Sequence, residues 1–212
     1  MTAEEKAREA GRLAVFPLGV VLFPGGLLQL RIFEPRYVRM VSECLRQQSP
    51  FVVAAILAGR EAGDVAVPAT SGTLTEIIDW EQLEDGLLGL LCEGRQRVAI
   101  GELSAEPDGL LRAQVEPLAS EAPAGLPDEL GWMAQLLEQL LKQLGAPYDR
   151  LLREAPGAGD VADRLVELLP IPLAQKQALF ETPGPLERLR RLAALIDPEG
   201  AGQRPGGAGA GE

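Results

Sequence analysis

Residue types that commonly perform catalysis are scarce in this chain of 212 residues, which contains two cysteines, three lysines and no histidine. Without histidine, neither a serine–histidine–carboxylate nor a cysteine–histidine arrangement can form, and histidine metal sites are excluded. A lysine that activates a serine must be desolvated beside it, whereas we expect Lys6 in a charged arm and Lys142 and Lys176 on polar helix faces. The sequence therefore predicts no catalytic centre, no metal and no cofactor.

The sequence also contains no Walker-type phosphate loop, because no stretch fits the pattern G-x-x-x-x-G-K-[ST]. Neighbouring carboxylates occur at 84–85 and 128–129. The first pair falls at a predicted turn and the second at a predicted helix start, so turn chemistry and the helix dipole explain both. We therefore predict that the chain is not an enzyme.

Composition limits the partners of the chain. Thirty-one acidic residues against 20 basic ones give a formal net charge of −11, which disfavours nucleic acid and anionic membranes. The most apolar stretch, residues 15–37, contains three prolines and three glycines, and the segment before it balances acids and bases. It is therefore predicted to be neither a membrane helix nor a signal peptide. We expect a cytoplasmic protein in which Cys44 and Cys92 are buried thiols, with one disulfide between them as the alternative.

Short strands separated by turns are predicted for the first half of the chain. In LLQLRIF (27–33) apolar and polar residues alternate, which is typical of a half-buried strand, and the proline in LAVFPL (13–18) indicates an edge strand. Glu34-Pro35 predicts a helix start, and Asp85-Gly86 predicts a hairpin. Residues 12–118 are expected to form an antiparallel sheet or small barrel with one inserted helix.

The second half of the chain is predicted to be helical. A segment rich in proline, glycine and alanine forms a predicted linker at 119–127, and apolar residues recur at helical spacing over 128–197. In the last helix, the RLRRL segment (188–192) is expected on the outer face. Residues 1–11 are predicted to be a flexible arm and 198–212 a disordered tail, because neither has apolar residues to bury.

Three segments, taken in order, resemble the Lon amino-terminal domain family, the substrate-binding module at the front of ATP-dependent Lon proteases. VFPLGVVLFPGGLLQLRIFEPRYVRMVSECL resembles the start of that domain. SGTLTEIIDWEQLEDGLLGLLCEGRQRVAI is similar to its "GT…I" strand, "DG" hairpin and "G-x-x-R" strand, and DVADRLVELLPIPLAQKQALFETPGPLERLRRLAALI is similar to its helical part. The resemblance covers about residues 12–197. It implies an α+β fold, with a PUA-like antiparallel β-barrel subdomain that contains an inserted helix, followed by an α-helical subdomain.

The resemblance also implies what is missing. Lon proteases continue into an ATPase domain and a Ser-Lys protease domain, and this chain ends at residue 212. We therefore expect a stand-alone member without either activity.

The opening apolar stretch is the predicted binding surface. Most of it is expected to pack the barrel, but a half-open barrel edge could capture an unfolded polypeptide by apolar contact and strand addition. The candidate contact residues are Phe23, Leu27, Phe33, Arg36 and Tyr37.

A structural corner is predicted next to this surface. Its residues are Pro24, Gly25, Glu34, Pro35 and Arg97. Because Glu34 lies in an apolar stretch, its charge needs a partner, for which Arg36, Arg95 and Arg97 are candidates. Alternation along the strand favours Arg97.

Two functions remain open at this point. The first is a non-enzymatic polypeptide-binding module, an adaptor or a self-associating accessory protein linked to ATP-dependent proteolysis. The alternative is a PUA-like module that binds nucleic acid or a small ligand. Charge favours the first, since only EGRQRV and RLRRL offer clustered arginines.

Overall fold

The computed structural model describes residues 11–59 and 66–197, so nearly all of the predicted arm and the whole predicted tail lie outside the described residues. The described part contains a seven-stranded sheet and five α-helices. The strands are β1 (Leu13–Leu18), β2 (Leu27–Ile32), β3 (Phe51–Ala58), β4 (Val67–Pro68), β5 (Ser71–Gln82), β6 (Leu88–Ala105) and β7 (Leu111–Pro117). The α-helices are α2 (Pro35–Gln47), α3 (Gly131–Leu144), α4 (Ala158–Leu168), α5 (Leu173–Glu181) and α6 (Pro185–Ile196), and 3-10 turns span Asp128–Leu130 and Tyr148–Leu151.

The chain forms two compact units. One comprises the residues up to 120 together with 169–181, and the other comprises 121–168 and the residues from 182 onward. Helix α5 thus belongs to the unit that contains the sheet, where the ring of Phe180 packs edge-on against Phe23 with 5.0 Å between the ring centroids. The sequence predicted helical structure over 128–197 but could not show which core α5 joins. The boundaries proposed from composition remain a prediction.

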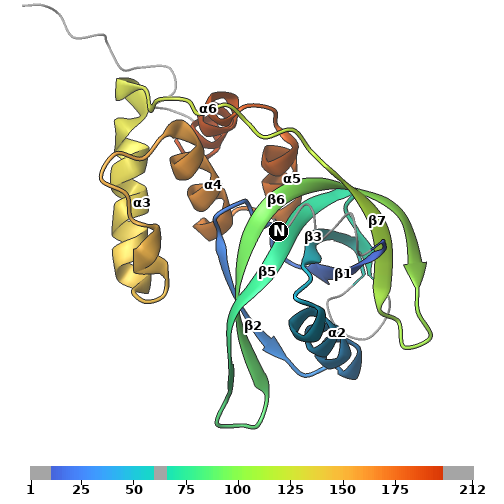
Figure 1. Ribbon diagram of the computed structural model, residues 1–212. Helices are drawn as coiled ribbons and strands as arrows, with labels where there is room; N and C mark the ends of the chain where they lie inside the picture. The colour runs from blue at the N-terminus through green and yellow to red at the C-terminus, as the bar shows by residue number, and fades with distance from the viewer. Residues whose placement is uncertain (1–10, 60–65, 198–212) are drawn as a thin grey trace, which may run out of the picture. The chain divides into compact units, whose positions relative to one another are not determined.

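The sheet of the first unit closes into a barrel. Its strands follow the order β1-β7-β6-β5-β3, and β1 also pairs in parallel with β3, with Val15 opposite Val52 (Figure 1). β1 pairs with β7 on one side and with β3 on the other, and all six of its residues are buried, so the expectation of an edge strand was wrong. Pro17 is tolerated because it lies beyond Val15, the last residue of β1 that pairs with β7, so only one side of the strand forms a ladder there.

Strands β5 and β6 form a long hairpin that extends beyond the closed barrel (Figure 1). β3 pairs with β5 only over 73–75, whereas residues 76–82 of β5 pair with one side of β6 and β2 pairs with its other side. These segments make a three-stranded arm. The Asp85-Gly86 turn is confirmed: Gly86 has φ +81°, and the Leu87 amide donates to the Asp85 side chain at 3.1 Å.

Helix α2 begins at Pro35 as the sequence predicts, with Glu34 at its N-cap. Its buried apolar face comprises Tyr37, Met40, Val41 and Cys44. The Tyr37 ring stacks on Phe16 of β1 with 4.0 Å between centroids, which fixes the helix on the barrel.

Both cysteines are buried free thiols, as expected, and the disulfide alternative is wrong. Burial raises the pKa of Cys44 to about 11 and that of Cys92 to about 12. Because the thiolate is the reactive form, burial makes both thiols poor nucleophiles near neutral pH.

A charged network joins α2 to the β6–β7 hairpin. Arg39 pairs with Glu43 at 3.0 Å, with Asp108 at 2.7 Å and also with Glu106. Arg112 pairs with Glu106 at 2.6 Å and also with Glu43. The hydrogen bond from Arg39 is the main reason that the pKa of Glu106 lies below its ordinary value of 4.5.

We expect this network to make the first unit sensitive to acid. A carboxylate with a lowered pKa in the folded state stabilises that state above pH 4.5, and the contribution is lost as the pH falls through the lower folded value. Glu106→Gln should therefore cost about 1 kcal/mol at pH 7 and lose less stability than wild type on acidification to about pH 3. Urea unfolding at both pH values measures this, with Glu116→Gln on the exposed side of β7 as the control. Equal acid losses in wild type and Glu106→Gln would contradict it.

The second unit is a small helical bundle. Helix α4 packs against both α3 and α6 (Figure 1). The buried apolar side chains include Met133, Leu141, Leu165, Leu189 and Leu192. At its centre is a charged residue, Arg188 of α6, which is fully buried. Its guanidinium pairs with Glu121 and with Asp163, each at 2.6 Å. The expectation that RLRRL lies on the outer face was therefore wrong for Arg188, although Arg190 and Arg191 are exposed.

Candidate functional site

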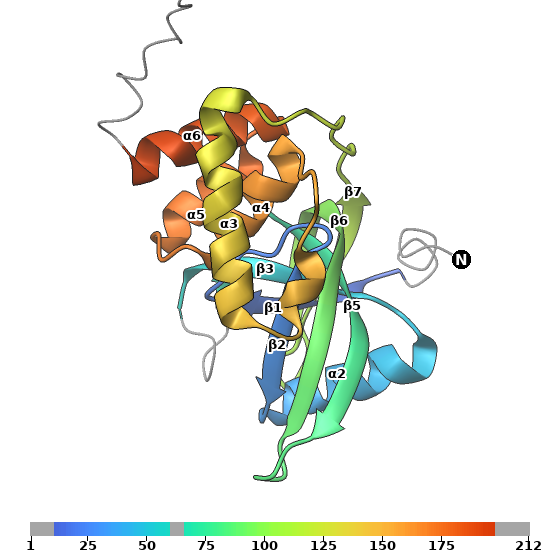
Figure 2. The same cartoon turned by 90° about the vertical axis from the view of Figure 1, so that its left-hand side faces the viewer.

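Unpaired backbone and exposed apolar surface occur together at β2. Among the described strands, β2 pairs with β6 alone, so its other edge has no strand partner. Figure 2 shows β2 beside β6 at the margin of the sheet. Phe33, which directly follows β2, is 61% exposed. An open strand edge next to an exposed aromatic ring is a surface on which another extended chain can pair.

A hollow of about 200 Å³ lies along this edge. Apolar side chains from β1 and from the start of α2 line it together with the end of β2: Phe16, Leu18, Ile32, Phe33 and Tyr37. The hollow can therefore take an apolar side chain from a segment paired with β2.

The corner between β2 and α2 is held by an ion pair between close neighbours. The guanidinium of Arg36 lies 2.8 Å from the Glu34 carboxylate and 4.8 Å from the centre of the Tyr37 ring, and it also donates to the Gly109 carbonyl at 3.2 Å. Glu34 thus pairs with Arg36. These contacts hold the start of α2 in place, close to the exposed Phe33.

The preference for Arg97 as the partner of Glu34 was wrong. β2 pairs with residues 88–93 of β6, whereas Arg97 lies further along β6, opposite Thr73 of β5. The guanidinium of Arg97 instead donates to the Phe180 carbonyl at 2.8 Å and lies over the Phe180 ring. Alternation along the strand predicted the face of the sheet on which Arg97 lies, but it could not predict how far along β6 Arg97 lies from Glu34.

The other predicted corner residues, Pro24 and Gly25, form the turn that enters β2. Gly25 has φ +74°, and its amide donates to the Gly94 carbonyl at 2.8 Å. The Gly94 amide in turn donates to the Gly26 carbonyl at 3.0 Å. This reciprocal pair positions the first residues of β2 on β6.

The five predicted contact residues divide into two groups. Phe33, Arg36 and Tyr37 lie at the corner, where Arg36 and Tyr37 are buried and Phe33 is exposed. Phe23 and Leu27 lie at the other end of β2 and are buried in the core, so in this conformation they support the strand and leave the accessible contact to Phe33.

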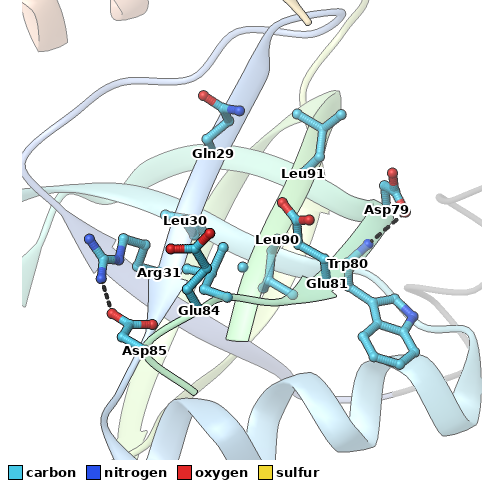
Figure 3. Close-up of a pocket in the computed structure, with 12 residues that line it drawn as sticks. Gln29, Leu30, Arg31, Asp79, Trp80, Glu81, Glu84, Asp85, Leu90 and Leu91 are labelled. Atoms are coloured by element: carbon cyan, nitrogen blue, oxygen red, sulfur yellow. Dashed lines mark hydrogen bonds and ion pairs between the residues drawn. The ribbon is translucent and has the colours of Figure 1, made fainter. Parts of the chain in front are cut away.

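A second, larger groove of about 800 Å³ lies on the three-stranded arm. Figure 3 shows side chains of β2 facing an acidic hairpin. The lining residues are Gln29, Leu30, Arg31, Asp79, Trp80, Glu81, Leu83, Glu84, Asp85, Gly89, Leu90 and Leu91. Sequence reasoning missed this groove because it explained the acids at 84–85 by turn chemistry alone. The four acids within 79–85 were the available signal.

The described residues contain neither a candidate metal site nor a candidate membrane-spanning helix. Within 11–59 and 66–197, no three cysteine, aspartate or glutamate side chains are grouped so that they could hold a metal ion. No helix in the described part of the chain is long and apolar enough to cross a membrane.

Comparison with known proteins shows the family to which this fold belongs. Residues 12–197 match the family model for the ATP-dependent protease La (LON) substrate-binding domain. The chain therefore belongs to the Lon substrate-binding domain family. Two relatives are Lon proteases, from Xanthomonas oryzae pv. oryzae and from Methylocella silvestris. Each is 29% identical over 195 residues, covering 88% and 87% of this chain. The chain spans only 23% and 24% of the length of these relatives.

Solved structures agree with the fold. A Lon N-terminal domain protein from Xanthomonas campestris is 34% identical, with a TM-score of 0.69, and the match covers 86% of this chain and 97% of that one. The N-terminal domain of a Mycobacterium avium complex Lon protease matches with a TM-score of 0.59 over 89% of this chain and 99% of its own, at 18% identity, which speaks for the fold alone. The predicted fold class, a β-barrel subdomain with an inserted helix followed by a helical part, is confirmed.

Proposed function

We propose that this chain is a non-catalytic polypeptide-binding protein with a substrate-recognition or adaptor role linked to ATP-dependent proteolysis. The observation that carries the proposal is the open edge of β2 beside the exposed Phe33 and its apolar hollow. Main-chain pairing at such an edge demands little of the sequence that binds, and the hollow adds apolar contact. Membership of a substrate-binding domain family supports this assignment.

Unfolded or partly folded chains are the partners that such a site fits. A native protein has its apolar side chains buried and its strands paired, so it offers neither group to β2. A second copy of the chain could use the same edge. The acidic composition, with a formal net charge of −11, speaks against the nucleic-acid alternative.

Fluorescence anisotropy tests the proposal with three equally labelled probes: a reduced and alkylated protein that stays unfolded, its native disulfide-bonded form, and a single-stranded RNA. We expect the unfolded protein to bind with a Kd of about 1 μM, which corresponds to about 8 kcal/mol, and the other two to bind much more weakly. Tighter binding of the RNA, falling steeply with salt, would favour the alternative function.

A matched pair of variants locates the site. Phe33→Ser removes an apolar side chain that is 61% exposed at the edge, and Leu57→Ser removes one that is 60% exposed on β3. We expect Phe33→Ser to weaken binding of the unfolded protein about tenfold and Leu57→Ser to leave it unchanged. Equal effects of the two substitutions would place the contact elsewhere.

A further inference from the structure

We propose that the segment bound at β2 is one in which apolar and basic residues alternate; this inference rests on the polypeptide binding proposed above. Successive side chains of a paired strand point to opposite faces of the sheet. A segment added to the edge of β2 would therefore present its odd and even side chains to two different surfaces. The two faces of β2 differ in chemistry, and this difference selects the pattern.

The first face is apolar. Leu30 and Ile32 of β2 point to this side, where they pack with the core that contains Phe16 and Tyr37. The hollow of about 200 Å³ lies beside them with Phe33 at its rim. Side chains of the added segment that point this way would be buried, and their burial is favourable only if they are apolar.

The second face carries carboxylates beside apolar residues of the groove: in the pairing register Asp79 and Glu81 of β5 share this face with Gln29 and Arg31 of β2. Gln29 and Arg31 of β2 are exposed on this side and line the groove of about 800 Å³ (Figure 3). Arg31 is paired with Asp85, so its charge is already compensated. Arg31 is also the sole basic residue among the described residues that line the groove.

Three exposed carboxylates of this groove, Asp79, Glu81 and Glu84, have no ion-pair partner within the part of the chain that the structure describes. Asp79 accepts a hydrogen bond from the Trp80 amide at 2.9 Å, which leaves Glu81 and Glu84 as the better placed pair. Adjacent strands lie about 4.8 Å apart, so a strand added to the free edge of β2 would lie three strand spacings, or about 14 Å, from Glu81 on β5. A lysine or arginine side chain on that strand extends part of the way over the groove, and the remaining attraction acts through space and is screened by salt. The carboxylates would attract such a base and repel an acid at the same position.

Charge complementarity on one face and apolar burial on the other thus select the same occupant. An all-apolar strand would leave the acidic groove unmatched, and a strand with acidic alternate residues would meet repulsion there. The inference therefore specifies a class of segment within unfolded chains: an extended stretch with leucine-like residues on one face and lysine or arginine on the other.

The test uses the full chain and labelled peptides of equal length in which leucine alternates with lysine, with serine or with glutamate. At low salt we expect the lysine peptide to bind about fivefold tighter than the serine peptide, and the glutamate peptide to bind most weakly. The advantage of lysine over serine should disappear at high salt. It should also fall in the Glu81→Gln, Glu84→Gln double variant, while the serine peptide keeps its affinity.

The control is the Glu116→Gln, Glu129→Gln double variant, which removes two exposed negative charges far along the chain from the groove. It should keep the full advantage of lysine. Equal binding of all three peptides, or a lysine advantage that survives in the Glu81, Glu84 variant, would overturn the inference and leave the proposed function standing. Failure of the serine peptide and of the unfolded protein to bind at all would instead refute the proposed function.

Discussion

Arg188→Met should destabilise the helical unit by about 3 to 5 kcal/mol, because it removes from a buried site the cation that pairs with both Glu121 and Asp163. The Arg188 side chain is fully buried, and its guanidinium lies 2.6 Å from both Glu121 and Asp163. It also donates to the Thr182 carbonyl at 3.3 Å. One side chain thereby joins the segment at 121 to α4 and α6, so its loss weakens three parts of the unit together.

Urea unfolding and amide hydrogen exchange of α4 and α6 measure this effect. Arg190→Met is the control, since Arg190 is exposed two residues away on the same helix, and it should change stability by less than about 0.5 kcal/mol. Replacing both carboxylates as well, with Glu121→Gln and Asp163→Asn, should recover part of the loss because the two negative charges that Arg188 compensates are then removed with it. Similar results for Arg188→Met and Arg190→Met would show that the buried ion pairs contribute nothing to the bundle.

Local patterns predicted the elements that depend on neighbours in the sequence. Alternation identified β2, the Glu34-Pro35 pair identified the start of α2, and Asp85-Gly86 identified the hairpin. Each of these signals comes from backbone conformation or from the face that a side chain must bury, so a few adjacent residues are enough to encode it.

Features that join distant segments could not be predicted in this way. A helical pattern places Leu189 and Leu192 on an apolar face, but it cannot show that carboxylates from positions 121 and 163 come to meet Arg188. A continuous apolar run predicts a buried strand without naming its neighbours, so the parallel pairing that closes the barrel stayed hidden.

The candidate site shows the same division. Phe33 lies in a segment that the sequence singled out, and the structure gives it an open strand edge and a hollow. The acidic groove was not predicted, because it is formed only when β2 and β5 pair with the two sides of the same stretch of β6.

The turn that leads into β2 depends on a glycine in β6, which gives the second large expected effect. A Cβ atom at Gly94 would lie 2.3 Å from the carbonyl oxygen of Phe23 and 3.1 Å from a methyl group of Thr73. A backbone oxygen cannot rotate away as a side chain can, so Gly94→Ala must push the turn and the start of β2 off β6. We expect a loss of about 2 to 4 kcal/mol in the stability of the first unit.

Gly89→Ala is the matched control, because it changes the same residue type in the same strand. There the added Cβ meets the end of the Leu83 side chain at 2.9 Å, and that flexible side chain can turn aside at little cost. Urea unfolding should therefore separate the two variants by at least about 2 kcal/mol. Gly94→Ala should also weaken binding of the unfolded protein under conditions where the barrel remains folded, since it displaces the edge that we propose as the binding surface. A stable Gly94→Ala protein with unchanged affinity would show that the position of β2 is not set by this contact.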